Sequence, residues 1–158
     1  MIKTSWIIVN SIWFRICINS ICRANNNYIR WGIIAFNDNG NYNTANGSYA
    51  LYDNTSGGYN TAIGAFSFRY NGTGSFNTGS GYGVLANNNG DGNTASGMEA
   101  LYSNTTGYSN VAIGTRALYS NTTSSNQVAI GDSALYHQNG NSVYNTAIGS
   151  KALYSNIT

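Results

Sequence analysis

Hydrophobic and polar residues follow one pattern that recurs through residues 32–158. A β-prone segment, Asn-Thr-Ala-Ile-Gly or a close variant, ends in a glycine, and a shorter apolar segment, Ala-Leu-Tyr or a variant, follows it. Seven copies are clear, and their closing residues are Gly47, Gly64, Gly81, Gly97, Gly114, Gly131 and Gly149. These glycines are 17, 17, 16, 17, 17 and 18 residues apart. Because self-similarity at a fixed period marks a repeat architecture, we divide the chain into a leader, residues 1–31, and a repeat array, residues 32–158.

Each copy reads as two short strands joined by two turns. Thr-Ala-Ile favours a strand, whereas Ala-Leu-Tyr fits either a strand or a helix. The intervening Asn-Thr-Thr-Gly is typical of turns, because Asn tolerates left-handed backbone angles and Gly supplies positive φ. A helical-hairpin repeat needs roughly 34 residues, which is twice this period. The sequence therefore predicts an all-β protein, a β-solenoid of about seven 17-residue coils.

Two positions of the repeat hold only residues suited to a core. One is always Ala or Gly, and the other is always Leu or Phe. The predicted core comprises Ala45, Leu51, Ala62, Phe68, Leu85, Ala95, Leu101, Ala112, Leu118, Ala129, Leu135, Ala147 and Leu153. The residue before each closing glycine is Ile, Ser or Asn, which predicts an outward or subunit-interface position. Asn recurs at matching positions, so we expect amide ladders along the axis, as in cross-β assemblies.

Composition narrows the class of protein. Charged residues make up 8% of the chain, proline is absent, the net charge is +2, and there are two cysteines. A disordered chain would be richer in Pro and charge, a disulfide scaffold would hold more Cys, and a nucleic-acid-binding protein would have a larger basic excess. We therefore expect no nucleic-acid partner and no membrane insertion by the repeat region. The basic leader fits either a secretory signal peptide or an atypical N-terminal cap.

Residues that could carry catalysis or bind a metal are scattered. Cys17 and Cys22 lie in the leader without further metal ligands nearby, and His137 is the single histidine. The five acidic residues share no repeat position. We therefore expect no enzyme activity, no metal and no cofactor. Five asparagines match the N-glycosylation pattern, and we interpret them as turn residues: Asn54, Asn71, Asn104, Asn121 and Asn156.

The repeat motif carries a family resemblance. Asn-Thr-Ala-Ile-Gly, followed by Ala-Leu-Tyr-Ser-Asn-Thr-Thr-Gly, resembles the YadA-like head repeats of trimeric autotransporter adhesins and of related phage and viral fibre proteins. The resemblance covers residues 32–158. It implies a left-handed β-roll in which three chains associate, and hence a homotrimeric, extracellular module at a bacterial cell surface. The repeat is longer here than in that family, and the extra residues lie in the Asn-Thr-Thr-Gly turn.

The function that follows is structural and adhesive. A rod of repeated groups would attach to a host-surface protein or glycan, and repetition lets weak contacts add by avidity. Two alternatives stay open. The same repeats could form the shaft of a phage or viral tail fibre, which would place the protein on a virion. Alternatively, a Thr ladder could bind ice or carbohydrate; it consists of Thr44, Thr61, Thr78 and Thr94.

Overall fold

The computed structural model describes residues 39–138 and 144–156 in full, and the backbone of four strands before them. These are β1 (Trp6–Val9), β2 (Ile12–Arg15), β3 (Cys22–Ala24) and β4 (Asn27–Arg30). β1 pairs antiparallel with β2, β3 pairs antiparallel with β4, and β4 pairs in parallel with the first repeat strand, β5. The side chains of Cys17 and Cys22 lie outside the described part, and the role of the leader stays a prediction.

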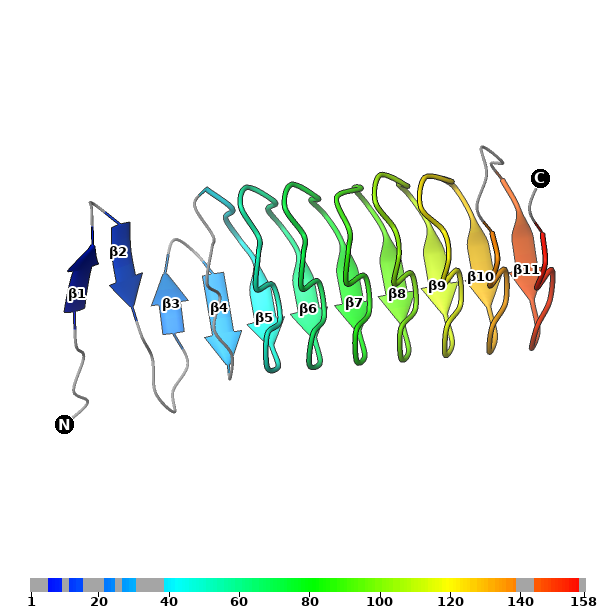
Figure 1. The fold of residues 1–158 in the computed structure, drawn as a ribbon, viewed down its shortest axis with the longest axis horizontal. Helices are drawn as coiled ribbons and strands as arrows, with labels where there is room; N and C mark the ends of the chain where they lie inside the picture. Colours follow the sequence, from blue (N-terminus) through cyan, green and yellow to red (C-terminus); the bar gives the residue numbers. More distant parts are fainter. Residues whose placement is uncertain are drawn as a thin grey trace.

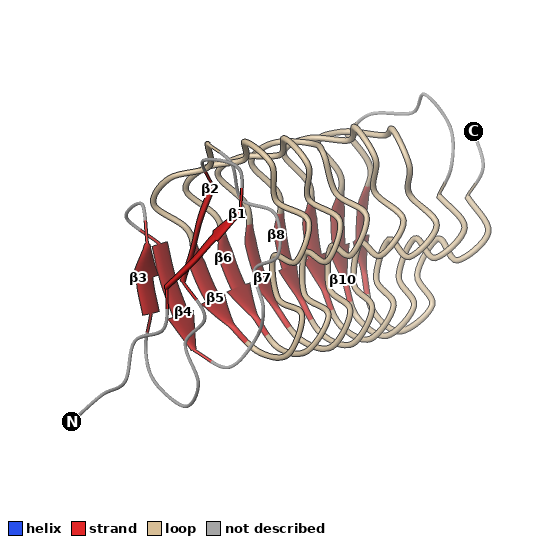
Figure 2. Ribbon diagram, turned by 60° about the vertical axis from the view of Figure 1, so that its left-hand side comes forward, coloured by secondary structure: helices blue, strands red, loops and turns tan. Residues whose placement is uncertain are grey.

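Seven three-residue strands, one in each repeat, form a continuous parallel sheet. They are β5 (Thr44–Asn46), β6 (Thr61–Ile63), β7 (Thr78–Ser80), β8 (Thr94–Ser96), β9 (Val111–Ile113), β10 (Val128–Ile130) and β11 (Thr146–Ile148). Neighbouring strands pair in register, so Ala62 lies opposite Ala45. The coils stack along one axis (Figure 1), and the strands form one face while turns complete each coil (Figure 2). The described residues contain no helix, and the predicted all-β solenoid is confirmed.

The second strand expected in each repeat is absent from the described coils. Ala-Leu-Tyr forms a turn instead, in which Leu51 has a φ of 52° and its equivalents have φ between 50° and 53°. A left-handed backbone costs a non-glycine residue roughly 1–2 kcal/mol, whereas burying a Leu side chain gains about 1.5–3 kcal/mol. Burial therefore outweighs the backbone penalty, and the left-handed residue makes a corner of the coil.

The turns are nevertheless hydrogen-bonded from coil to coil. The Leu51 N–H donates to the Ser67 carbonyl at 3.0 Å, and the Phe66 N–H donates to the Ser48 carbonyl at 2.8 Å. Equivalent bonds recur in the following coils, for example from the Leu118 N–H to a carbonyl of the next coil at 3.0 Å. Backbone pairing therefore extends well beyond the sheet, as the burial of peptide groups between stacked coils requires.

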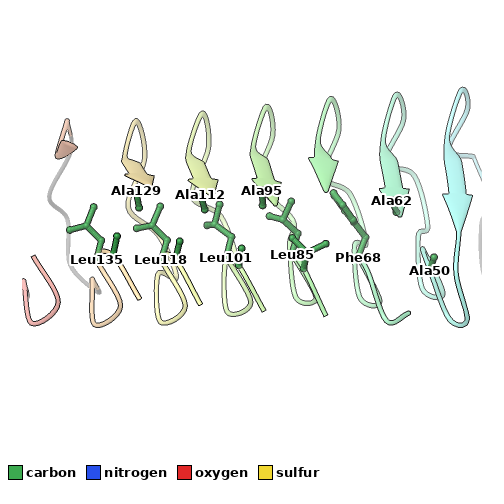
Figure 3. Close-up of a cluster of buried hydrophobic side chains, with 14 of the residues drawn as sticks. Ala50, Ala62, Phe68, Leu85, Ala95, Leu101, Ala112, Leu118, Ala129 and Leu135 are labelled. Carbon is green, nitrogen blue, oxygen red and sulfur yellow. The ribbon is translucent and has the colours of Figure 1, made fainter. Parts of the chain in front are cut away.

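The core is a narrow column of small and large apolar side chains. Figure 3 shows Leu101, Leu118 and Leu135 pointing from the turns toward the alanines of the strands. The predicted core residues between Ala45 and Ala147 are at most 3% exposed. Leu153 departs from the prediction, with half of its surface exposed (50%). It lies in the last described coil, and no further described coil packs on it.

Phe68 and Gly79 form a compensated pair within this column. Phe68 replaces the usual Leu, and Gly79 of the next coil replaces the usual Ala. A Cβ added at Gly79 would lie 2.4 Å from Cε2 of Phe68 and 3.0 Å from Cγ1 of Val84. The larger ring therefore occupies the volume that a methyl group fills in the other coils.

We expect Gly79→Ala to lower the free energy of unfolding by about 1–3 kcal/mol, because it overpacks a dense core. Phe68→Leu in the Gly79→Ala background should restore most of this loss, since it recreates the Leu and Ala pair of the neighbouring coils. Urea unfolding of the wild type, the two single variants and the double variant measures the coupling. Additive effects of the two substitutions would contradict the proposed fit of Phe68 against Gly79.

Two rows of buried amides make up most of the remaining, polar interior. The first amide row is Asn43, Asn60, Asn77, Asn93, Asn110 and Gln127, and the second is Asn54, Asn71, Asn88, Asn104, Asn121 and Gln138. In the first row each Asn Oδ1 accepts the backbone N–H of its successor at 2.8–3.0 Å. In the second row the side chains from Asn54 to Asn121 bond directly to one another, as from Asn71 Nδ2 to Asn54 Oδ1 at 2.8 Å. The expected amide ladders are confirmed.

Four asparagines of the second amide row match the N-glycosylation pattern, and their burial bears on whether they can carry a glycan. Asn54, Asn71, Asn104 and Asn121 are at most 1% exposed and hydrogen-bonded through their side-chain nitrogens. A glycan on any of these nitrogens would require that coil to open. The turn interpretation therefore fits these four residues.

Candidate functional site

The outer face of the parallel sheet presents two rows of side chains. Successive residues of a strand point to opposite faces, so the middle Ala or Gly of each strand is buried and its two neighbours point outward. The first outer row is Thr44, Thr61, Thr78, Thr94, Val111, Val128 and Thr146, and the second is Asn46, Ile63, Ser80, Ser96, Ile113, Ile130 and Ile148. The position before each closing glycine thus points outward, as one of the two predicted options.

The sheet face changes character along its length. Around β7 and β8 it carries only Thr and Ser. On β9 and β10 the two rows carry Val and Ile, with Val128 opposite Val111 and Ile130 opposite Ile113. Ile113 is 42% exposed. The Thr ladder is therefore in register over four strands and then passes into an aliphatic patch.

The closing glycines follow the strands directly and turn the chain out of the sheet. Their φ values lie between 118° and 153°, a region that residues with a side chain rarely occupy. They therefore act as backbone corners, and they present no functional group to solvent.

Aromatic side chains stack in rows on the turns. The first aromatic row is Tyr42, Tyr59 and Phe76, with ring centroids 4.9 Å apart at both steps. The second aromatic row is Tyr102, Tyr119, Tyr136 and Tyr154, with centroids 5.1–5.3 Å apart. The coil spacing matches the stacking distance of aromatic rings, so equivalent rings in successive coils meet face to face.

Charged groups are few among the described residues. Arg116 Nε donates to Glu99 Oε2 at 2.8 Å on the surface. This hydrogen bond and the Glu99 charge raise the pKa of Arg116 above its usual value. Burial raises the pKa of Tyr119, and the Glu99 carboxylate raises it further. The contact with Glu99 therefore favours the charged form of Arg116.

His137 lies at the edge of the second aromatic row. It is exposed, and its ring makes edge contacts with Tyr136 at 4.7 Å and Tyr154 at 5.0 Å between centroids. The described residues hold no group of three His, Cys, Asp or Glu side chains that could bind a metal ion. They also hold no helix with the length and apolar character to cross a membrane.

The sequence analysis did not identify the aromatic rows. Tyr42 and Tyr59 each precede an Asn of the first amide row, and Phe76 does the same in the third copy. This recurrence was the available signal. It did not reveal stacking, because these residues have a left-handed φ near 60° that their identity does not suggest.

Comparisons with known proteins leave the family of this chain open. No protein-family model, no curated protein and no solved structure matches it. The resemblance to adhesin head repeats consequently rests on the motif alone, and the fold and its surfaces carry the functional argument.

Proposed function

We propose that the chain is a structural and adhesive surface module, a left-handed β-roll segment of a trimeric, YadA-like adhesin at a bacterial cell surface. Three copies would pack through their sheet faces and present the turns, with their aromatic rows, to a host-surface protein or glycan. The observation that carries this proposal is the aliphatic patch of Val111, Ile113, Val128 and Ile130, which Ile148 extends on the next strand. The other outward residues of the sheet face are polar, except for Ile63. The same assembly would suit a tail-fibre shaft on a virion.

Burial of this patch is the physical reason for association. Transfer of apolar surface out of water is favourable by about 25 cal/mol per Å², and contiguous exposed apolar surface typically marks an interaction site. The patch belongs to a regular sheet whose in-register rows repeat with the coils. Flat, regular rows on identical chains match one another, which favours self-association over binding of an irregular partner.

Repetition along the rod supports the adhesive part of the proposal. The aromatic rows place equivalent rings about 5 Å apart along the axis. Tyr offers a large contact area at low entropic cost. Contacts repeated on one rod, and again on three chains, gain effective concentration without any strong single site.

The test of the assembly is the mass of the full chain in solution. Sedimentation equilibrium should give about three times the 16.9 kDa of one chain. Ile113→Asp/Ile130→Asp should sediment as a monomer, because two carboxylates from each of the three chains would meet at the buried interface. The control Ser56→Asp/Thr123→Asp adds the same charge at exposed turn residues and should keep the trimer.

A wild-type chain that remains monomeric over the accessible concentration range would overturn the trimer. Circular dichroism of each variant separates loss of assembly from loss of fold. Adhesion is then measured by binding of the wild type and of the Ile113→Asp/Ile130→Asp variant to immobilised cells. Avidity predicts much weaker binding by the monomer.

A further inference from the structure

The first aromatic row ends at a missing ring. Tyr42, Tyr59 and Phe76 occupy the position before the Asn of three successive coils, and Gly92 occupies it in the fourth. Its φ of 66° matches the values of 59–60° for the three aromatic residues. The backbone is therefore in the conformation that presents a ring to the row, while the ring itself is absent. Phe76, 63% exposed, is the last ring before this gap.

A hollow of about 330 Å³ occupies the gap. This volume is at the lower end of the range typical of small-ligand sites, about 300–1,000 Å³. Its lining includes Phe76, Asn89, Asp91, Gly92, Thr106 and Ser109. An aromatic wall is thus combined with a carboxylate, an amide and hydroxyl groups.

The polar groups of the hollow have capacity for a ligand. Asp91 Oδ1 accepts the Ser75 N–H at 2.8 Å, and Asn89 Oδ1 accepts the Thr73 N–H at 3.2 Å. These bonds fix both side chains. A carboxylate has about four acceptor sites, and this bond engages one of them. The lining contains one acidic and no basic residue, so it disfavours an anion and favours a ligand that donates hydrogen bonds.

We propose that this hollow binds a sugar ring, stacked on Phe76 in the place of the missing aromatic side chain. The thickness of a pyranose matches the spacing between successive rings of the aromatic row, and its C–H face packs on an aromatic ring. Its hydroxyl groups donate to Asp91 and Asn89 and exchange hydrogen bonds with the hydroxyls of Thr106 and Ser109. An aromatic side chain from another protein would also stack on Phe76, but it would use fewer of the remaining acceptor sites of the Asp91 carboxylate than a sugar with several hydroxyl groups.

This proposal deepens the adhesive function and rests on it for the biological setting only. All residues that line the hollow come from a single chain, so sugar binding does not require the trimer. The oligomeric state is measured separately by sedimentation, so failure of either result leaves the other intact.

The experiment fills the gap with the side chain that the row itself uses. Gly92→Tyr should fold normally, because Tyr42 and Tyr59 already adopt this φ and a Cβ at Gly92 lies no nearer than 3.7 Å to Ser109 Oγ. The matched control is Asn126→Tyr, two coils further along the same row with a φ of 57°. Residue 126 is not part of the hollow.

The probes are methyl glycosides of glucose, galactose and N-acetylglucosamine, with p-cresol as an analogue of a Tyr side chain. Saturation-transfer NMR should show binding of at least one glycoside, in the millimolar range typical of small single sites, to the wild type and to Asn126→Tyr. Gly92→Tyr should abolish the signal, and Asp91→Asn should weaken binding at least about tenfold.

Three results would overturn the sugar site. The first is that no glycoside binds the wild type. The second is that Gly92→Tyr binds a glycoside as well as the wild type does. The third is that p-cresol binds at the hollow and no glycoside does. The last result would assign the hollow to an aromatic side chain of a protein partner.

Discussion

Gly114→Ala is expected to lower the free energy of unfolding by roughly 3–5 kcal/mol, because backbone strain and a steric clash act together. Gly114 has a φ of 129°, where an L-residue is strained. A Cβ there would also lie 2.5 Å from the Gly131 carbonyl oxygen and 2.6 Å from its carbon. Both atoms belong to the backbone of the next coil, so relief of the clash requires two coils to separate.

Gly149→Ala is the matched control for this effect. Gly149 has a similar φ of 124°, but no atom lies within 4 Å of a Cβ built on it. This variant therefore carries the strain without the clash, and we expect a loss of at most about 1–3 kcal/mol. Urea unfolding followed by circular dichroism gives both values. Equal losses in the two variants would show that coil-to-coil contact does not contribute.

The buried positions of the core could be predicted from the sequence, because the size of the side chains at each repeat position is enough to identify them. Ala62 and Leu118 are buried, and a slot that accepts only small or only large apolar residues indicates burial whatever the backbone does. The Ala-Leu-Tyr turn could not be derived in this way. Leu118 at a φ of 53° is unfavourable by itself, and only its burial in a stack of coils compensates for the strain.

Of the candidate functional surfaces, one could also be predicted from the sequence and the other could not. The outward position of Ile113 follows from the alternation of side chains along a strand, which the sequence shows. The hollow at Gly92 does not, since Gly90-Asp-Gly92 reads as an ordinary turn. The missing ring is recognised only when Gly92 is aligned with Phe76 of the preceding coil. That alignment depends on the register of the coils and on the left-handed backbone of both residues.

Asn77→Ala is expected to lower the free energy of unfolding by roughly 2–4 kcal/mol. Asn77 Oδ1 accepts the Asn93 N–H at 2.8 Å, and Asn77 Nδ2 donates to the Gly90 carbonyl at 2.9 Å. Asn77 and Asn93 are both fully buried. Alanine removes the acceptor of the Asn93 N–H and leaves a cavity, whereas the Gly90 carbonyl keeps its bond from Asn88 at 2.7 Å.

The exposed Asn46 on β5 provides the control for Asn77. Asn46→Ala removes the same amide from a position that is exposed on the single chain, and we expect its effect on the unfolding of that chain to stay within about 0.5 kcal/mol. Urea unfolding of both variants isolates the contribution of burial. A loss below about 1 kcal/mol for Asn77→Ala would mean that water replaces the amide. The amide row would then follow from the repetition of the sequence without stabilising the stack of coils. A loss in the expected range would make the amide row a determinant of coil stacking, because each Asn of this row bonds across its own coil and also holds the backbone of the next coil.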